Sequence, residues 1–429
     1  MEEMKDSDIR WIGQIPKNWK VIRVKDAFTR KKAKAKQENP VILSLARSGV
    51  KVRDITNNEG QLAENYSDYN PVMVDDLLLN PMDLISGDNC NISRVEGVIS
   101  PAYVNLRYKN GINPEFYNFY FKYQYWCKAF FAYGKGVSFE NRWTLNYDTL
   151  ERFPLILPPI EEQNRIVKFL KGKCAEIDAL HMDIEKQIET LEEYKKSIIT
   201  EAVTKGLDPD VEMKDSGISY IGNIPKHWKV TNLKYLGKCQ NGISKGGEYF
   251  GNGFPFVSYG DVYKNYSIPQ NVDGLIMSTK TEQNIYSVKY GDVFFTRTSE
   301  TIEEIGFAST CLKSIDNSVF AGFLIRFRPT SSDLIPEFSK FYFRSNIHRK
   351  FFVKEMNLVT RASLSQNLLG RLPVLLPPLC EQQMIAINLE KKCAEIDGAI
   401  EEKIEQLETL EQYKKSLIYE YVTGKKEVK

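Results

Sequence analysis

Two long stretches of the chain carry apolar residues at alternating steps of three and four residues. From Ile166 to Ile198 the mean step is about 3.6 residues, the period of an α-helix, and Glu and Lys fill most positions between. The same pattern returns from Ile385 to Leu417. Both stretches are therefore predicted to form long coiled-coil helices. Their predicted seam consists of Ile166, Leu170, Ile177, Ile184, Ile188, Leu191, Ile385, Leu389, Ile396, Leu407 and Leu410.

The first helix is bounded by ordinary start and stop signals. Pro158 and Pro159 precede it, Glu161 and Glu162 place negative charge in its first turn, and Gly206 follows its last turn. A helix of this size, about 43 residues, would be ~65 Å long.

The chain contains a tandem duplication. Residues 4–25 match residues 213–234 at 14 of 22 positions, and residues 155–206 match residues 374–425 at 26 of 52 positions. The offset is 209 in the first block and 219 in the second, so the middle of the second half is 10 residues longer. The two halves therefore share common segments around two divergent inserts.

The duplication predicts how the helices pair. Only the short segment 205–212 separates the first helix from the next globular part, so we expect that part at the far end of the helix. The second helix would then return antiparallel to the first. Pairing between different chains is the alternative, but the joint duplication of helix and domain favours pairing within one chain. The predicted boundaries are 1–155 and 207–373 for the domains, and 156–206 and 374–425 for the helices.

The inserts are predicted to be mixed α/β (α+β). Strand-like runs at 40–45, 72–74, 97–100, 254–258 and 292–296 alternate with turns rich in Gly, Asn, Asp and Ser. Aromatic residues gather in two predicted helices near 115–132 and 336–353. We interpret these aromatics as core residues and not as platforms for stacking bases. The predicted fold is thus two α/β domains separated by an antiparallel pair of long helices, with approximate two-fold symmetry.

Charge is unevenly distributed, although the formal net charge of the 429 residues is only +2. Residues 1–155 carry a net charge of +3 and residues 213–373 carry +7, whereas the helical segments 156–212 and 374–429 carry −5 and −3. Basic domains beside acidic helices are typical of a protein that contacts phosphates with its domains. The total alone would have argued against a nucleic-acid partner.

Several basic and polar residues of the inserts are candidates for contact with DNA phosphates or base edges. The run 30–36 is the most basic, and a solvated loop is its equally acceptable alternative. The candidates are Arg30, Lys31, Lys32, Lys34, Lys36, Arg47, Arg53, Arg94, Lys135 and Arg142 in the first domain, and Asn241, Ser244, Lys245, Tyr259, Arg297, Thr298 and Arg361 in the second.

Catalytic and metal-binding signatures are missing from the sequence. It has no nucleophile elbow, HExxH, phosphate loop or GxGxxG after a strand, and the glycines at 242–247 have the wrong spacing for a phosphate loop. Asn80-Pro-Met-Asp83 is interpreted as a turn and not as a methyltransferase motif. The three His are far apart, so no catalytic residue and no metal site are predicted.

The location of the protein is predicted from what the sequence lacks. No apolar run is long enough to span a membrane, and the polar amino terminus predicts no signal peptide. Seven scattered Cys without a CxxC motif are typical of free thiols in a reducing compartment. We therefore expect a cytoplasmic protein.

The repeated landmarks identify a family resemblance. Ile12-Gly-x-Ile-Pro-x-x-Trp19 and Ile221-Gly-x-Ile-Pro-x-x-Trp228 begin the two halves. Leu157-Pro-Pro-x-x-Glu-Gln163 and Leu376-Pro-Pro-x-x-Glu-Gln382 begin the two helices. Together with Asn80–Leu84 and Gly97–Pro101, they make the whole chain resemble the specificity subunit of type I restriction-modification systems.

The resemblance implies a role without catalysis. Each domain would be a target-recognition domain that reads one half of a bipartite, asymmetric sequence in double-stranded DNA. The helices would set the spacing and dock two methyltransferase subunits, which hold S-adenosylmethionine and methylate adenine; this chain itself would hold no cofactor. Restriction subunits would complete the endonuclease.

Two alternatives from other classes stay open at this point. A coiled-coil scaffold that binds only proteins would show no salt-dependent binding to DNA. A fused methyltransferase would bind S-adenosylmethionine itself, which the missing cofactor motif argues against. The target sequence cannot be derived from residue types, because base readout depends on the geometry of loops.

Overall fold

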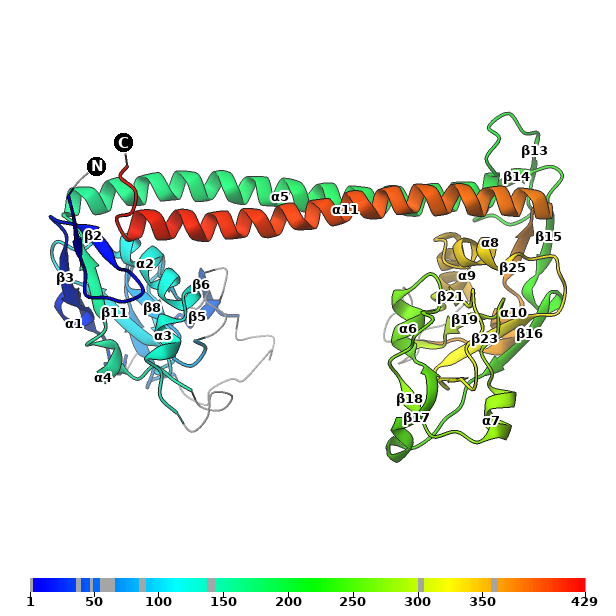
Figure 1. The fold of residues 1–429 in the computed structure, drawn as a ribbon, viewed down its shortest axis with the longest axis horizontal. Coiled ribbons are helices and arrows are strands. Elements are labelled where there is room, and N and C mark those ends of the chain that lie inside the picture. The colour runs from blue at the N-terminus through cyan, green and yellow to red at the C-terminus, as the bar shows by residue number, and fades with distance from the viewer. Residues whose placement is uncertain are drawn as a thin grey trace. The chain divides into compact units, whose positions relative to one another are not determined.

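The computed structural model describes residues 3–35, 40–46, 49–54, 66–84, 90–136, 143–299, 305–355 and 362–428. The chain forms two compact units, Met1–Ile184 with Ile404–Lys429, and Glu185–Lys403. Each unit holds one α/β domain together with a stretch of both long helices, α5 (Ile160–Lys205) and α11 (Leu379–Val422) (Figure 1). None of the helices in the described ranges is long and apolar enough to cross a membrane.

The described part of the first domain is built from short strands and four helices. Its elements are β1 (Met4–Asp6), β2 (Gln14–Pro16), β3 (Lys20–Arg23), α1 (Val24–Ala27), β4 (Phe28–Arg30), β5 (Leu43–Ala46), β6 (Gly49–Val52), β7 (Asn70–Val72), β8 (Leu77–Leu79), β9 (Cys90–Ile92), β10 (Gly97–Ile99), β11 (Val104–Tyr108), α2 (Pro114–Trp126), α3 (Ala129–Ala132), α4 (Tyr147–Leu150) and β12 (Pro154–Leu157).

The second domain follows the same order with additional elements. These are β13 (Met213–Asp215), β14 (Asn223–Pro225), β15 (Lys229–Asn232), η1 (Leu233–Tyr235), β16 (Gly237–Asn241), η2 (Gly247–Tyr249), β17 (Phe250–Val257), α6 (Tyr259–Lys264), β18 (Leu275–Ile276), α7 (Lys280–Ile285), β19 (Val293–Thr296), β20 (Thr298–Ser299), β21 (Ala308–Thr310), β22 (Val319–Phe320), β23 (Leu324–Pro329), α8 (Pro336–Tyr342), α9 (Ile347–Glu355), β24 (Ala362–Ser363), α10 (Gln366–Gly370) and β25 (Pro373–Leu376).

The two domains share one sheet topology, which confirms the predicted fold class. A four-stranded antiparallel sheet has the order β4-β11-β8-β9 in the first domain and β16-β23-β19-β21 in the second. A two-stranded ribbon then leads into each long helix, β3 with β12 before α5 and β15 with β25 before α11. The duplication thus extends through inserts whose sequences have diverged. All five predicted strands overlap an observed strand.

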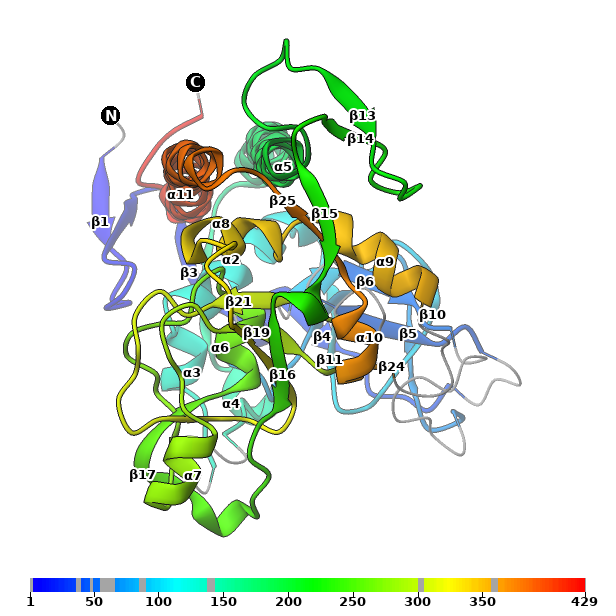
Figure 2. The same cartoon turned by 90° about the vertical axis from the view of Figure 1, so that its right-hand side faces the viewer.

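A helix rich in aromatics lies between each sheet and the long helices. In α2, Phe116, Tyr117, Tyr120, Phe121 and Tyr125 are at most 1% exposed and belong to the core of the first domain. In the second domain, α8 lies between α11 and the sheet (Figure 2), with a buried face of the same type. The interpretation of these aromatics as core residues is therefore confirmed.

Within each unit, the local stretches of α5 and α11 pack antiparallel. In the first unit, Lys414 Nζ lies 2.6 Å from Asp178 Oδ1, and in the second, Lys195 Nζ lies 2.6 Å from Asp397 Oδ2. These are the same two positions of the repeated helix, exchanged between the two copies. Opposite charges flanking an apolar seam are the usual way that a helix pair selects its register.

The seam is well buried near the domains. Ile166, Leu170 and Ile177 of α5 are at most 6% exposed, and Ile385, Leu389 and Ile396 of α11 are at most 7% exposed. The other predicted seam residues, Ile184, Ile188, Leu191, Leu407 and Leu410, have intermediate exposure. Domain packing therefore supplies much of the burial at the seam.

Each sheet contains a buried ion pair that the sequence did not reveal. In the first domain, Arg107 donates from Nε and Nη2 to the Asp76 carboxylate, both at 2.7 Å. In the second, Arg328 donates to the Asp292 carboxylate in the same way, both at 2.6 Å. The two carboxylates have side chains that are 1% exposed, and the Asp76 partner raises the pKa of Arg107 through its hydrogen bond.

We predict that Asp76→Asn lowers the free energy of unfolding by about 3 kcal/mol, because it leaves the Arg107 guanidinium without its counter-charge. Urea unfolding followed by Trp fluorescence measures this. The control Glu3→Gln removes an exposed ion pair with Lys17 and should change stability by less than about 1 kcal/mol. Equal effects of the two substitutions would contradict the structural role of Asp76.

Candidate nucleic-acid interface and its supporting frame

Each domain is fastened to the long helices by a buried tryptophan. Trp19 Nε1 donates a hydrogen bond of 2.9 Å to Glu162 Oε2 in the first turn of α5. Trp228 Nε1 makes the equivalent 2.9 Å bond to Glu381 Oε2 in the first turn of α11. Both indole rings are fully buried. This bond therefore joins the Ile-Pro-x-x-Trp motif of each half to its Leu-Pro-Pro-x-x-Glu-Gln motif.

The glutamine after each glutamate closes the junction between domain and helix. Gln163 accepts from the Asn113 amide at 2.8 Å and donates to the carbonyls of Pro158 at 2.8 Å and Gly111 at 3.2 Å. Gln382 makes the equivalent three bonds in the second unit. Both side chains are fully buried. A glutamate there would lack the two donors that these carbonyls require.

Each tryptophan also contacts the end of the long helix that it does not begin. Gly206, with φ of +80°, ends α5 beside Trp228, and a Cβ at this position would lie 3.4 Å from the ring. Gly424, with φ of +70°, ends α11 against Trp19 so closely that a Cβ would clash with Pro16. Positive φ favours glycine at both positions, and lack of space favours it further at Gly424. Each tryptophan therefore fixes the start of one helix and the end of the other.

Three predicted contact residues of the second domain, Asn241, Arg297 and Thr298, lie along one edge of its sheet, at the start of β23. Asn241 ends β16 opposite Ile325, and Thr296 ends β19 opposite Leu324, so Asn241 and Arg297 flank the start of β23 from its two sides. The backbone of Arg297 bonds to the Phe323 carbonyl at 2.9 Å. The described residues offer Arg297 no ion pair, which leaves its charge available for an anion.

Lys245, Asn241 and Tyr259, also predicted contact residues of this domain, have different surroundings. Lys245 donates to Glu282 and to the Met277 carbonyl, both at 2.8 Å, so its charge is already paired. Asn241 Oδ1 is buried and has no hydrogen-bond partner among the described residues. Tyr259 begins α6 and stacks on Tyr263 with ring centroids 5.8 Å apart. Their contact with a ligand stays a prediction.

The edge also contains a residue that the sequence did not single out. Phe323 is 65% exposed, although it lies in the tight turn between β22 and β23. The turn is held from both sides, because Gly322 packs against Ser244 and Gly242 donates to the Leu324 carbonyl. An exposed aromatic ring on a rigid turn, beside Arg297 and Ser244, is suited to contact an apolar group such as a thymine methyl.

The first domain places a basic strip at the equivalent edge strand. Arg30 ends β4 with its guanidinium 4.5 Å from the centre of the Tyr147 ring, and Lys31 and Lys32 follow it. The described part of the chain gives neither lysine an ion pair, whereas Lys34 Nζ lies 2.8 Å from Asp68. Lys31 and Lys32 therefore retain charge for a ligand.

The remaining predicted residues of the first domain are dispersed. Arg94 pairs with Asp75 at 2.8 Å and with Glu115, which also binds Lys171 of α5, so it lies in an ion network beside the long helix. Arg53 follows β6, and exposed Lys135 bridges Thr144 through its backbone. Lys36, Arg47 and Arg142 lie outside the described residues, as does Arg361 of the second domain.

We predict that Trp19→Phe lowers the free energy of unfolding by about 1–3 kcal/mol, because the bond to the charged Glu162 is lost and the smaller ring fills less of the buried space. Thermal and urea unfolding measure this. The control is Trp126→Phe, which loses the same part of its ring, since that indole has no hydrogen bond to a described residue. If both variants lose stability equally, ring packing and not the hydrogen bond fastens the domain.

Comparison with known proteins identifies relatives along the whole chain. Residues 16–190 and 225–408 each match the family described as type I restriction modification DNA specificity domain. The chain is 28% identical over 444 residues to the putative type I restriction enzyme MjaX specificity subunit of Methanocaldococcus jannaschii, covering 97% of this chain and 96% of that protein.

Further relatives agree. The type I restriction enzyme MjaVIII specificity subunit of the same organism is 27% identical, over 97% of this chain and 95% of that protein. A chain solved in "Structural basis underlying complex assembly and conformational transition of the type I R-M system" matches with a TM-score of 0.70 and 14% identity, covering 95% of this chain and 98% of that one. At this identity, the match shows the fold.

Proposed function

We propose, on the premise that this chain belongs to the type I restriction modification DNA specificity family, that it is the sequence-recognition subunit of a type I restriction-modification complex. The observation that carries the proposal is the duplicated specificity domain, with side chains free for DNA at the equivalent edge of each sheet. Recognition without catalysis is the role that we propose for the chain itself, on the strength of this family.

The two domains would read different half-sites. They share a strand order, yet the first edge presents Lys31 and Lys32 beside Arg30, and the second presents Arg297 beside Phe323. Different side chains on one scaffold favour a target with two unlike halves. Arg297 suits guanine, to which arginine can donate two hydrogen bonds, and the lysines suit phosphates.

Chemistry on the DNA would belong to partner subunits. We propose that two methyltransferase subunits, holding S-adenosylmethionine and methylating adenine, dock on the acidic helices, and that restriction subunits join them. The duplicated helix frame supports two such positions. All seven cysteines are free, which supports a reducing, cytoplasmic location.

The first test is salt-dependent binding to DNA. If the assembled complex neutralises about six phosphates, its affinity for duplex DNA should fall about a thousandfold between 50 and 200 mM salt. Fluorescence anisotropy with labelled DNA measures this. Absence of DNA binding at low salt would favour the scaffold alternative, in which the chain joins only proteins.

The second test separates base readout from phosphate contact. Arg297→Ala should weaken binding to the methylated target by about 1–3 kcal/mol and relax the sequence read by the second domain only. Lys32→Ala should weaken binding to all sequences alike and reduce the salt dependence by about one counterion. Mapping methylated sites across the genome measures specificity. A relaxed sequence with Lys32→Ala, and an unchanged one with Arg297→Ala, would contradict these assignments.

A further inference from the structure

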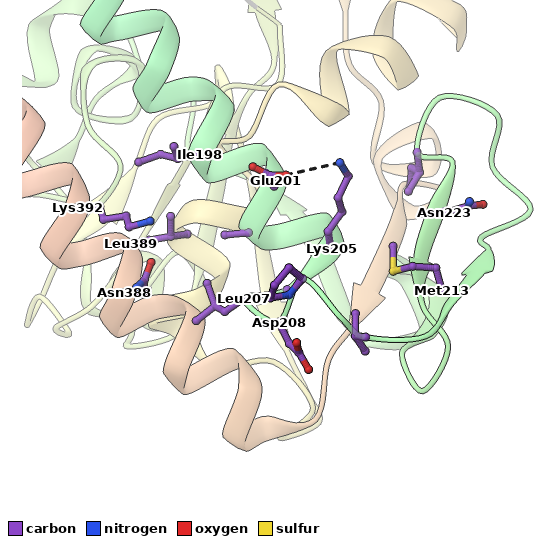
Figure 3. Close-up of a pocket in the computed structure, with 15 residues that line it drawn as sticks. Ile198, Glu201, Lys205, Leu207, Asp208, Met213, Asn223, Asn388, Leu389 and Lys392 are labelled. Atoms are coloured by element: carbon purple, nitrogen blue, oxygen red, sulfur yellow. Dashed lines mark ion pairs between the residues drawn. The ribbon is translucent and has the colours of Figure 1, made fainter.

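Hollow shape alone does not indicate a ligand in this chain. Beside the end of α5, the second unit has a hollow of about 720 Å³ (Figure 3). Its lining includes Lys392 and Asp208 as well as the 3.6 Å ion pair of Glu201 with Lys205. Charges of both signs lie there, so the hollow favours no class of ligand. The sheet edges are more informative, because corresponding positions carry different side chains in the two domains.

The buried Asp–Arg pairs of the two sheets show which edge residues correspond. Six residues after the buried aspartate, the first domain has Met82 and the second has Thr298. Five residues before the buried arginine, the first domain has Ala102 and the second has Phe323. The two residues of the second domain lie at its candidate DNA-binding edge, so Met82 and Ala102 mark the equivalent edge of the first.

The turns that lead into β11 and β23 have the same hydrogen bond. In the first domain, the Tyr103 amide donates to the Ser100 carbonyl at 3.0 Å. In the second, the Leu324 amide donates to the Ala321 carbonyl, also at 3.0 Å. The residue before the donor is exposed in both turns, an alanine in the first domain and Phe323 in the second. The turn of the first domain therefore presents only a methyl group where that of the second presents an aromatic ring.

Met82 gives the first domain a larger apolar group on the neighbouring loop. It follows β8 and is 52% exposed. Its amide donates to Asn80 Oδ1 at 2.9 Å, and the hydroxyl of the buried Tyr125 donates to the Asn80 carbonyl, also at 2.9 Å. The Leu145 amide donates to the Pro81 carbonyl at 2.8 Å. Met82 is therefore exposed on a loop that is bonded to the core of its domain.

Positive charge lies on the other side of β11. Strands β4 and β8 both pair antiparallel with β11 and run toward its start, one on each side. Lys31 and Lys32 follow β4, and Met82 follows β8, so all three emerge at the same end of the sheet. Asp83, the residue after Met82, is partly buried and interacts within the chain. The edge therefore combines cations, which suit phosphates, with an exposed apolar side chain.

The base edges in the major groove of DNA display one apolar group, the C5-methyl of thymine. A methionine side chain is unbranched and polarizable, so it can adapt its shape to such a group. We propose that Met82 determines specificity in the first domain by contacting the C5-methyl group of a thymine in its half-site. The inference rests on the proposed function of DNA recognition. Because Phe323 lies on the other loop, the two domains make their apolar contacts from different places, which favours unlike half-sites.

The test removes the methionine and the methyl group separately and together. The probes are labelled duplexes that carry the target found by mapping methylated sites, with each thymine replaced in turn by uracil, which lacks the methyl group. For the assembled complex with the unmodified chain, one replacement should weaken binding about fourfold, the effect of losing one buried methyl group. Met82→Ala should weaken binding to the intact target at least as much, and should make that replacement neutral. Fluorescence anisotropy measures each affinity.

Met73→Ala is the matched control, because Met73 is 48% exposed but precedes β8 and lies toward the opposite end of that strand. This variant should keep the full effect of the uracil replacement. Met82→Leu, which preserves an apolar side chain of similar volume, should restore most of the effect. Uracil replacements whose effect never depends on Met82 would overturn this inference and leave the proposed function intact. An unmodified complex without sequence-specific binding would overturn both.

Discussion

The hydrogen bond from a buried tryptophan to the first-turn glutamate of a long helix is the contact on which the architecture depends. Trp19 stands directly before β3, β3 pairs with β12, and β12 leads into α5, so one indole ties the sheet ribbon to the helix. The same ring meets Gly424 after α11. Trp228 repeats this arrangement with Glu381 and Gly206. A shift of either helix by one residue would break one contact of each tryptophan.

This frame could be predicted from the sequence because its segments occur twice in the chain. Motif similarity marked the junctions, the 3.6-residue period gave the helices, and the clustering of aromatics gave α2 and α8. The strand order was not accessible. Strands such as Leu77–Leu79 have three buried residues and no alternation, and Asp76 meets Arg107 from 31 residues away. Only the folded sheets show that Asp292 and Arg328 repeat that pair.

The candidate interface could be predicted only in part, because the sequence shows which residues are charged but not which of them form ion pairs in the folded domain. Lys245 and Arg94 are basic residues in basic domains, yet carboxylates within the same domain bind both. The described residues give Arg297, Lys31 and Lys32 no ion pair. Nothing in the sequence indicated Phe323 as a contact residue, since phenylalanine is ordinarily a core residue. Its exposure depends on the turn that packs Gly322 against Ser244.

The identity of the two tryptophan junctions has an evolutionary consequence. Each recognition domain begins at an Ile-Pro-x-x-Trp segment and ends at a Leu-Pro-Pro-x-x-Glu-Gln segment, and both segments make the same bonds in either half. A gene segment that runs from one motif to the other encodes a domain together with the residues that bond it to the helices. Recombination within the two motifs can therefore exchange one recognition domain for another without changes in the helices. New DNA specificities can thus arise in a single genetic step.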